Sequence, residues 1–291
     1  MDLMMSVAVM ETDKYCLRRA LRPFSFSVAL ITCLTGILTA AADGFGDPLR
    51  ILAVLCGGVL LQAGVNLIND YSDLDALRQP DAVQQVQRNF RLGLGCFAVA
   101  TLIALWLITQ VGSSLLLLCS VGLVGALGYT LKPINYKARG LGVVLVFWLM
   151  GVLMVTGSHL AISGEWSLKA AVLSLPLSVL VALLLLSNEL RDIESDRADG
   201  IETLTVRVGY QHAARYYRIA LLAVCILTAV LLIAGYLASI WLLLPSILLL
   251  PGLLRLLRSS PQVRRALTPR TGRLLLVYGV GYCLTLATAL L

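Results

Sequence analysis

The chain has 291 residues, of which 59% are hydrophobic and only 13% are charged, and its net charge is +7. A soluble globular domain carries charge on about a quarter of its residues, so this composition excludes that class and predicts an integral membrane protein. The excess of positive charge does not indicate nucleic-acid binding, because basic and aromatic residues are not interleaved.

The apolar segments predict nine membrane-spanning helices in a single domain that occupies residues 1–291. We expect residues 1–23 to form a cytoplasmic amphipathic lead-in. They lack the layout of a signal peptide, because four cations precede a full-length apolar segment without a small-residue cleavage site. Each of the nine segments has spanning or near-spanning length. Their approximate limits are 24–42, 50–69, 92–111, 113–131, 141–163, 168–188, 217–234, 236–254 and 273–291.

The Lys and Arg residues predict the orientation. With nine spans, 21 of the 23 fall on the side of the N-terminus, and only Arg50 and Lys169 fall on the other side. Cytoplasmic loops are enriched in Lys and Arg, so the N-terminus is predicted to be cytoplasmic. We therefore expect a multi-pass protein, of the bacterial inner membrane, whose active-site mouth opens to the cytoplasm.

Arg22 and a first acidic motif lie at the predicted cytoplasmic ends of the first two spans. Arg22 precedes the first span and is either a positive-inside anchor or a phosphate ligand. The second span ends in Asn66-Leu-Ile-Asn-Asp-Tyr-Ser-Asp73, in which Asn66 and Asp70 share one face of a helix. Residues 75–91 then predict a polar loop with short helical character, long enough to fold back as a lid.

The fourth span ends in a basic segment, 129–142. Pro133 and the glycines end the helix there, and Lys132, Lys137 and Arg139 gather on the predicted cytoplasmic side. These cations serve either membrane topology or the binding of a diphosphate, which needs Lys or Arg as well as metal. Their coincidence with acidic motifs on the same side favours diphosphate binding.

A second acidic motif, Asn188-Glu-Leu-Arg-Asp-Ile-Glu-Ser-Asp196, begins where the sixth span ends. On a helix, Asn188, Asp192 and Asp196 are spaced i, i+4 and i+8 and share one face, with Arg191 and Glu194 turned elsewhere. Such a stripe of carboxylate and amide oxygens suits Mg²⁺, which prefers one or two carboxylates completed by substrate phosphates.

The two acidic motifs match in frame and in predicted side. Asn66 to Asn188 and Asp70 to Asp192 are both offsets of 122 residues. Four predicted spans separate them, and an even number returns the chain to the same side of the membrane. One acidic cluster beside a span is commonly a solvated helix end, but two in the same frame indicate a shared site. We therefore predict a site for a metal-bound polyanion.

The cysteines and histidines show no comparable pattern. The seven cysteines are scattered singly without metal-ligand spacing, so we interpret them as small apolar fillers. His159, at the outer end of the fifth span, and His212, in a basic amphipathic stretch, are expected to have structural roles.

Four stretches, taken in order, resemble the UbiA superfamily of intramembrane aromatic prenyltransferases, most closely its 1,4-dihydroxy-2-naphthoate prenyltransferase branch. The resemblance covers nearly the whole chain and implies an all-α integral membrane fold with nine transmembrane helices around a central cavity. The stretches are Leu21-Arg22-Pro23, Asn66 to Asp73, Tyr129-Thr-Leu-Lys-Pro with Lys137 and Gly140-Leu-Gly142, and Asn188 to Gly209.

The resemblance also implies a reaction that depends on Mg²⁺. A prenyl diphosphate would lie between the two motifs and ionise to an allylic cation, which an aromatic acid would attack. In the naphthoate branch the acceptor also loses its carboxylate, giving a demethylmenaquinone. The implied catalytic and metal-binding aspartates are Asp70, Asp73, Asp192 and Asp196, with Asn66 and Asn188 as neutral metal ligands. The implied substrate-binding residues are Arg22, Asn66, Asn69, Tyr71, Tyr129, Lys132, Lys137, Asn188 and Arg191.

Tyr71 and Tyr129 have two interpretations. Either ring would support the allylic cation through its face, or it would pack at the membrane interface.

Three positions depart from the family's pattern. Leu77 stands where the wider family often has an aspartate, with Asp75 or Asp81 as substitutes. The pair Ile201–Glu202 replaces a basic residue after the second motif, and Val143 replaces an acidic one.

Several alternatives stay open at this point. The acceptor is 4-hydroxybenzoate or homogentisate in other members of the superfamily, and a membrane terpene cyclase would need no acceptor. A secondary transporter is a more distant alternative, because its coupling carboxylates would be expected nearer the middle of the membrane. The expected partners are the two substrates and membrane lipid, with no nucleic acid and no obligate protein partner.

Overall fold

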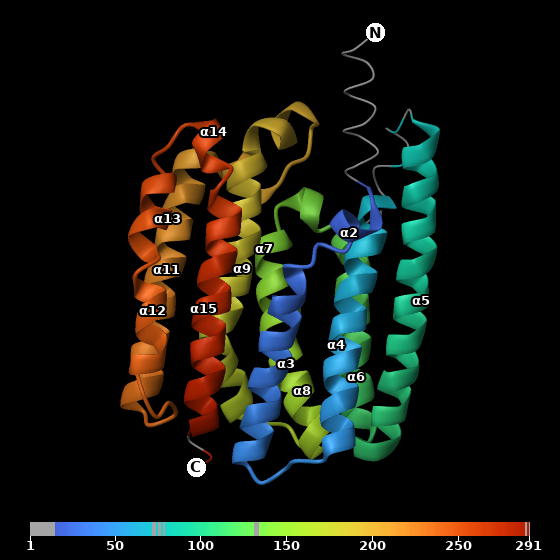
Figure 1. Ribbon diagram of the computed structural model, residues 1–291, viewed down its shortest axis with the longest axis vertical. Helices are drawn as coiled ribbons and strands as arrows, with labels where there is room; N and C mark the ends of the chain where they lie inside the picture. Colours follow the sequence, from blue (N-terminus) through green and yellow to red (C-terminus); the bar gives the residue numbers. More distant parts are fainter. Residues whose placement is uncertain are drawn as a thin grey trace.

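The structure, a computed structural model, describes residues 15–71, 74, 77, 79–130, 134–288 and 290. Every regular element in these residues is a helix. The long helices lie side by side along the longest axis of the molecule, so their ends gather at two opposite ends of a bundle (Figure 1). Residues 1–14 of the predicted lead-in, Asp73 and Lys132 lie outside the described residues.

Six helical runs are long and apolar enough to cross a membrane. They agree with six of the predicted spans and support a multi-pass membrane protein. These runs are α2 with α3 (Leu17–Ala20 and Ser25–Ala42), α4 (Pro48–Asn69), α5 (Pro80–Val111), the continuous run of α7 (Gly142–Val146), η3 (Phe147–Leu153) and α8 (Met154–Ser163), α9 (Leu168–Ala198) and α11 (Tyr210–Ile233).

The other three predicted spans correspond to helices that are shorter, broken or less apolar. α6 (Ser113–Thr130) is apolar but short, and α15 (Leu267–Thr288) carries two arginines near its start. The predicted span 236–254 is divided between η4 (Trp241–Leu243), α12 (Leu244–Ile247) and α13 (Leu250–Leu256). The count of nine crossings therefore stays a prediction. The remaining short elements are η2 (Lys137–Arg139), α10 (Leu204–Val208) and α14 (Pro261–Arg264).

The polar segment predicted as a loop is helical from Pro80 onward. α5 is one continuous helix of 32 residues, and its first residue is a proline, whose missing N–H is not needed there. Val86 and Asn89 are buried, and Asn89 Nδ2 donates to the carbonyl of Tyr15 at 2.8 Å. The lid prediction is therefore wrong over most of its length, because polar residues beyond the apolar segment extend the helix and do not end it.

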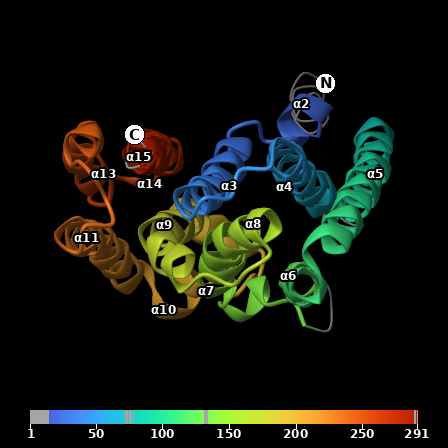
Figure 2. The same ribbon diagram turned by 90° about the horizontal axis from the view of Figure 1, so that it is seen from below.

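α9 contacts α3, α7, α8, η3, α10, α11 and α15, whereas α4, α5 and α6 lie on the other side of α3 and α8 (Figure 2). Pro176 interrupts the backbone hydrogen-bond ladder of α9, and nearby Tyr282 of α15 donates to the carbonyl of Leu173 at 2.8 Å. α9 continues past the predicted span limit at residue 188, so the second acidic motif is helical. This confirms that Asn188, Asp192 and Asp196 lie on one helical stripe.

Both acidic motifs lie at the same end of the bundle. α4 ends at Asn69 beside α2, and α9 ends next to α10. Both ends lie in the upper part of Figure 1. The α3–α4 connection and the start of α9 lie at the opposite end. The prediction that both motifs open on one side therefore agrees with the fold.

Candidate functional site

The first acidic motif lies at the end of α4, where the buried carboxylate of Asp70 forms an ion pair. Asp70 follows the last residue of the helix and is 5% exposed. Arg22 Nη2 donates to Asp70 Oδ1 at 2.6 Å. With the Asn69 amide oriented so that its oxygen faces Arg22, this oxygen accepts from both terminal guanidinium nitrogens at 3.1 Å. Arg22 therefore belongs to the acidic site and is not only a topological anchor.

Asn66 holds the turn that carries Arg22. Arg22 has a φ of 47°, a left-handed conformation that costs a non-glycine residue about 1–3 kcal/mol. Asn66 Nδ2 donates to the carbonyl of Leu21 at 2.7 Å and to Ser25 Oγ at 2.6 Å. Its Oδ1, the predicted metal ligand, already accepts from Gln62 Nε2 at 3.0 Å. The structure thus gives Asn66 a positioning role, whereas its role as a metal ligand stays a prediction.

The second acidic motif presents Asp192 and Asp196 from the last turns of α9. Arg191 donates to both carboxylate oxygens of Asp192, from Nε at 2.7 Å and from Nη2 at 2.5 Å. The expectation that Arg191 turns away from the stripe is therefore wrong, because its long side chain reaches around the helix to the next residue. Asp196 Oδ2 accepts from Thr203 Oγ1 at 3.3 Å. Asn188 is half-buried on the same face.

Tyr129 and Lys137 lie near charged residues of the acidic motifs. Tyr129 interacts electrostatically with both Arg22 and Glu189, so its hydroxyl lies within range of both motifs. Lys137, in η2, likewise interacts with Glu189 and Asp196. Residues from α2–α3, α4, α6, η2 and α9 therefore converge on one region that holds carboxylates and cations together.

The departures from the family pattern have contacts of their own. Glu202 pairs with Arg207 at 2.5 Å, and Arg207 also reaches the carbonyl of Ala138 at 3.4 Å. The acidic side chain at this position therefore ties the segment after α9 to the basic segment around η2. Asp81 lies in the first turn of α5, and Asp75 lies outside the described residues.

Tyr71 has a packing contact. Its ring stacks on Phe90 of α5, with ring centroids 4.1 Å apart. This contact favours the packing interpretation for Tyr71, whereas Tyr129 stays a candidate for supporting the cation.

The donor chemistry of the site fits a hard divalent cation. Asp70, Asp192 and Asp196 supply carboxylate oxygens, the ligands that Mg²⁺ prefers. Within the described residues, no three His, Cys, Asp or Glu side chains are grouped closely enough to hold a metal ion. Asp70 and Asp192 are instead neutralised by arginines. A metal would therefore bind together with an anion that draws the two guanidinium groups away from these carboxylates.

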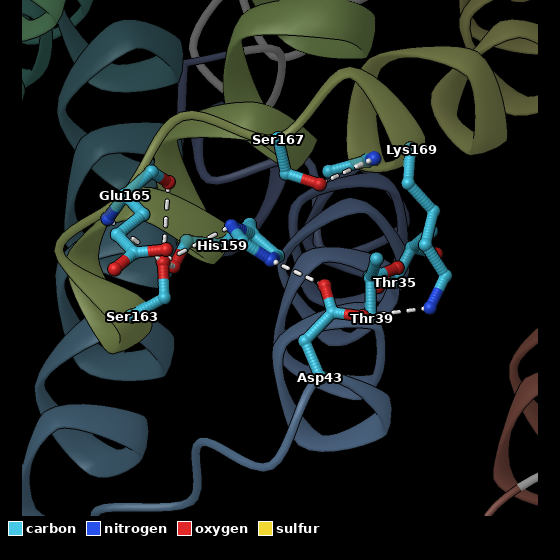
Figure 3. Close-up of polar contacts among 9 residues, drawn as sticks. Thr35, Thr39, Asp43, His159, Ser163, Glu165, Ser167 and Lys169 are labelled. Carbon is cyan, nitrogen blue, oxygen red and sulfur yellow. Dashed lines mark hydrogen bonds and ion pairs between the residues drawn. The ribbon is translucent and has the colours of Figure 1, made fainter.

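A second polar cluster lies at the opposite end of the bundle. Figure 3 shows Asp43 between His159 and Lys169. Asp43 Oδ2 lies 3.1 Å from His159 Nε2, and Asp43 Oδ1 lies 2.7 Å from Lys169 Nζ. Ser163 Oγ is 3.2 Å from His159 Nδ1 but also 3.0 Å from the carbonyl of His159. Because His159 is buried and the serine hydroxyl has a backbone acceptor, we assign this outer polar cluster a structural role, as expected for His159.

The sequence analysis gave no role to Glu189. This residue is 5% exposed, and its Oε2 accepts from the backbone N–H of Thr205 at 3.2 Å. Glu189 lies seven residues, or about two helical turns, before Asp196 and therefore shares its face of α9. That spacing was the available signal, but the partner on α10 depends on how the chain returns after residue 200.

The chain matches the model of the UbiA prenyltransferase family over residues 29–288. It is 31% identical to a 1,4-dihydroxy-2-naphthoate octaprenyltransferase of Escherichia coli K12 over 216 residues, which are 68% of this chain and 70% of that protein. It is 28% identical over 235 residues to the enzyme of the same name from Bacillus subtilis 168, with 76% and 74% of the two chains covered.

The fold is also similar to a solved structure, that of a UbiA homologue from Archaeoglobus fulgidus bound to DMAPP and Mg²⁺. The TM-score is 0.59 at 17% sequence identity, and the match covers 92% of this chain and 98% of the other.

Proposed function

The chain belongs to the UbiA prenyltransferase family, and from that premise we propose that it transfers a polyprenyl group from a prenyl diphosphate to 1,4-dihydroxy-2-naphthoate, in the biosynthesis of a menaquinone-type quinone. The observation that carries this proposal is that both acidic motifs lie at one end of the bundle, each with an arginine on its aspartate: Arg22 on Asp70 and Arg191 on Asp192. Two relatives named for this naphthoate acceptor support its choice.

The diphosphate binds by exchange of ion-pair partners. Arginine binds phosphate through two parallel N–H donors, as it binds carboxylate, so Arg22 and Arg191 can pass from their aspartates to the diphosphate. Lys137 adds a third positive charge near Asp196. The freed carboxylates of Asp70 and Asp192 would then hold Mg²⁺ together with Asp196. When bound, Mg²⁺ supplies positive charge that stabilises the diphosphate as a leaving group.

The reaction then balances without a further reactant. The C–O bond of the prenyl diphosphate breaks, and its electron pair stays on the diphosphate, where Arg22, Arg191 and Lys137 hold it. The ring carbon that bears the acceptor's carboxylate attacks the allylic cation and forms the new C–C bond. The carboxylate leaves as CO₂, and its bonding electrons restore the aromatic ring. Tyr129, which lies within electrostatic range of Arg22 and Glu189, would stabilise the cation through the face of its ring.

The polyprenyl tail and the membrane location follow from the apolar surface. α5, α6 and α11 expose large aliphatic side chains along their length, including Leu102, Leu123 and Ile226. Lipid acyl chains or a polyprenyl chain can cover such an apolar surface without desolvating a polar group. We propose that the end with the acidic motifs faces the cytoplasm of a bacterial inner membrane, because 21 of the 23 Lys and Arg residues lie on that side of the predicted spans.

The test is turnover by the purified protein in nanodiscs with Mg²⁺ and a prenyl diphosphate. Parallel reactions contain dihydroxynaphthoate, 4-hydroxybenzoate, homogentisate or no acceptor. We expect prenylated, decarboxylated product with dihydroxynaphthoate, and loss of most turnover on adding a chelator. The variants Asp70→Ala and Asp192→Ala should each lose most activity while inserting normally. Glu165→Gln, which changes an exposed carboxylate at the opposite end, is the matched control.

Each other result contradicts part of the proposal. Prenylation of a different acid would make the assigned acceptor wrong, and product without any acceptor would identify a cyclase. Normal turnover by both aspartate variants would rule out the shared site. No consumption of diphosphate under any condition would overturn the prenyltransferase assignment itself.

A further inference from the structure

Glu189 is a buried carboxylate that the proposed reaction does not use. It lies on α9 and is 5% exposed. A buried carboxylate is costly unless it is hydrogen-bonded, and Glu189 Oε2 accepts from the backbone N–H of Thr205 at 3.2 Å. In return, Thr205 Oγ1 donates to the backbone carbonyl of Glu189 at 3.1 Å. Two hydrogen bonds therefore fix Thr205 of α10 to this turn of α9.

Glu189 accepts the hydrogen bond from the first turn of α10 that the side chain of the N-cap residue usually accepts. Thr203 is the N-cap residue of α10, yet its side chain caps no N–H of the helix, although threonine at this position normally does so. Glu189 supplies the missing acceptor from the neighbouring helix, at the second residue of α10. The Thr203 hydroxyl is thereby released from capping.

The released hydroxyl is turned to the second acidic motif. Thr203 Oγ1 donates to Asp196 Oδ2 at 3.3 Å and lies 3.2 Å from Thr205 Oγ1. Each hydroxyl can donate only one hydrogen bond. The Thr203 hydroxyl donates to Asp196, and the Thr205 hydroxyl donates to the carbonyl of Glu189. At 3.3 Å the contact with Asp196 is long for an O–H···O hydrogen bond, so it orients the carboxylate without locking it.

The spacing of Glu189 and Asp196 on α9 allows both residues to contact the start of α10. Glu189 and Asp196 are seven residues apart, so they lie about two turns apart on the same face. The start of α10 lies against that face: Thr205 contacts Glu189 at the lower turn, and the N-cap residue Thr203 contacts Asp196 at the upper one. Thr203 and Thr205 are buried, so water does not compete for the contacts between Thr205 and Glu189, whereas Asp196 is only half-buried.

We propose that Glu189 is a positioning residue: by capping α10 from α9, it places the Thr203 hydroxyl so that Asp196 is oriented for the metal-bound diphosphate. This inference rests on the proposed function, because it assigns Asp196 to the diphosphate site. Glu189 itself touches neither metal nor substrate in this scheme. Its contribution is the register between α10 and the second acidic motif.

The test measures metal binding directly as well as turnover. Purified protein in nanodiscs is titrated with Mn²⁺ in the presence of inorganic pyrophosphate, and free Mn²⁺ is followed by electron paramagnetic resonance. The variants are Glu189→Ala, Glu189→Gln, Thr203→Val, Thr203→Ser and the double variant Glu189→Ala/Thr203→Val. The thermal unfolding midpoint of each is recorded, and binding is measured well below it.

We expect Glu189→Ala to weaken Mn²⁺ binding about tenfold and to raise the KM for prenyl diphosphate more than it lowers kcat. Glu189→Gln keeps an acceptor oxygen and should stay within about threefold of the unmodified protein. Thr203→Val should weaken binding about fivefold, the loss of a hydrogen bond of about 1 kcal/mol, and Thr203→Ser should restore it. The double variant should be no weaker than Glu189→Ala alone, because both changes break one connection.

Additive losses in the double variant, or a lowered unfolding midpoint with unchanged Mn²⁺ binding, would show that Glu189 only stabilises the fold. In that case normal turnover by the unmodified protein leaves the proposed function intact. If the unmodified protein binds no Mn²⁺ with pyrophosphate and turns over no substrate, both the proposed function and this inference are wrong.

Discussion

Arg22 Nη2 and Asp70 Oδ1 lie 2.6 Å apart and join the start of α3 to the end of α4. The two partners differ in exposure: the Asp70 side chain is 7% exposed and that of Arg22 is 47% exposed. The arginine can therefore reach a ligand, whereas the carboxylate is shielded from water. An anion that recruits Arg22 removes positive charge from beside this buried carboxylate, which is unfavourable, so an anion that brings its own cation binds at a lower cost. A metal-bound diphosphate is such an anion.

The first prediction concerns Arg22. Arg22→Ala should lower kcat/KM for the prenyl diphosphate at least tenfold, which corresponds to about 1.4 kcal/mol, because a charge-assisted hydrogen bond is lost. Arg22→Lys should recover only part of it, since an ammonium group cannot engage Asp70 and Asn69 together. Initial rates at varied prenyl diphosphate give both values. The matched control is Arg218→Ala, which changes an exposed arginine that donates to the carbonyl of Ala214 within α11. Equal kcat/KM values for Arg22→Ala and this control would contradict the prediction.

A second prediction separates two roles for Asn66. If Asn66 positions the Arg22 turn, then Asn66→Asp must behave like Asn66→Ala, because both lose the N–H donors to Leu21 and Ser25. Each should destabilise the fold by about 1–3 kcal/mol and lower kcat/KM. If Asn66 acts mainly as a metal ligand, the added carboxylate in Asn66→Asp should preserve or strengthen Mn²⁺ binding. Denaturant unfolding together with Mn²⁺ titration of the two variants decides between them.

The helical stripe of the second motif and the shared side of both motifs were predictable, because they depend on local period and on the parity of the spans. Asn188, Asp192 and Asp196 needed only a helix that continues past residue 188. α5 was misjudged because its polar residues 80–91 resemble a loop when they are compared with an apolar span. Their helical state depends on packing against the segment near Tyr15.

The missing parts of the site are contacts between residues distant in sequence. Arg22 meets Asp70 across 48 positions, and Glu189 meets Thr205 across 16. The local sequence pattern does not predict which carboxylate a given arginine or lysine will pair with, because the pairing depends on which helix ends lie close together in the fold. The pairing of Arg191 with Asp192 was missed for a different reason: side-chain length overrides the angular separation of neighbours on a helix.

A third prediction concerns the support of α9 at the same end. Arg264 of α14 is 5% exposed, pairs with Glu194 and lies over the ring of Tyr210 at 4.5 Å. Glu194→Gln leaves the buried guanidinium without its charged partner and should destabilise the fold by about 1–3 kcal/mol. The double variant Glu194→Gln/Arg264→Met should recover part of that loss, because an apolar side chain replaces the unpaired charge.

Thermal unfolding in nanodiscs provides the measurement, with Glu165→Gln as the exposed-carboxylate control. A double variant less stable than Glu194→Gln would show that Arg264 stabilises the fold by packing and not through the ion pair.

The last prediction uses the outer polar cluster. Partial burial alone would raise the pKa of Asp43, but hydrogen bonds from Lys169 and His159 outweigh it and hold the pKa below its ordinary value of 3.8. A carboxyl with a lowered pKa in the folded state stabilises the protein above its unfolded pKa, and this stabilisation is lost as the pH falls through the folded value. The difference in unfolding midpoint between the unmodified protein and Asp43→Asn should therefore shrink as the pH falls below about pH 4. Lys169→Met, which removes one of the two contacts, should show a smaller change of the same sign.

Turnover at neutral pH should be unaffected by Asp43→Asn, because the 18 residues of α3 place Asp43 about 27 Å from the Arg22 end. A midpoint difference that persists unchanged at pH 3 would mean that the charge of Asp43 contributes nothing and that only its shape is used.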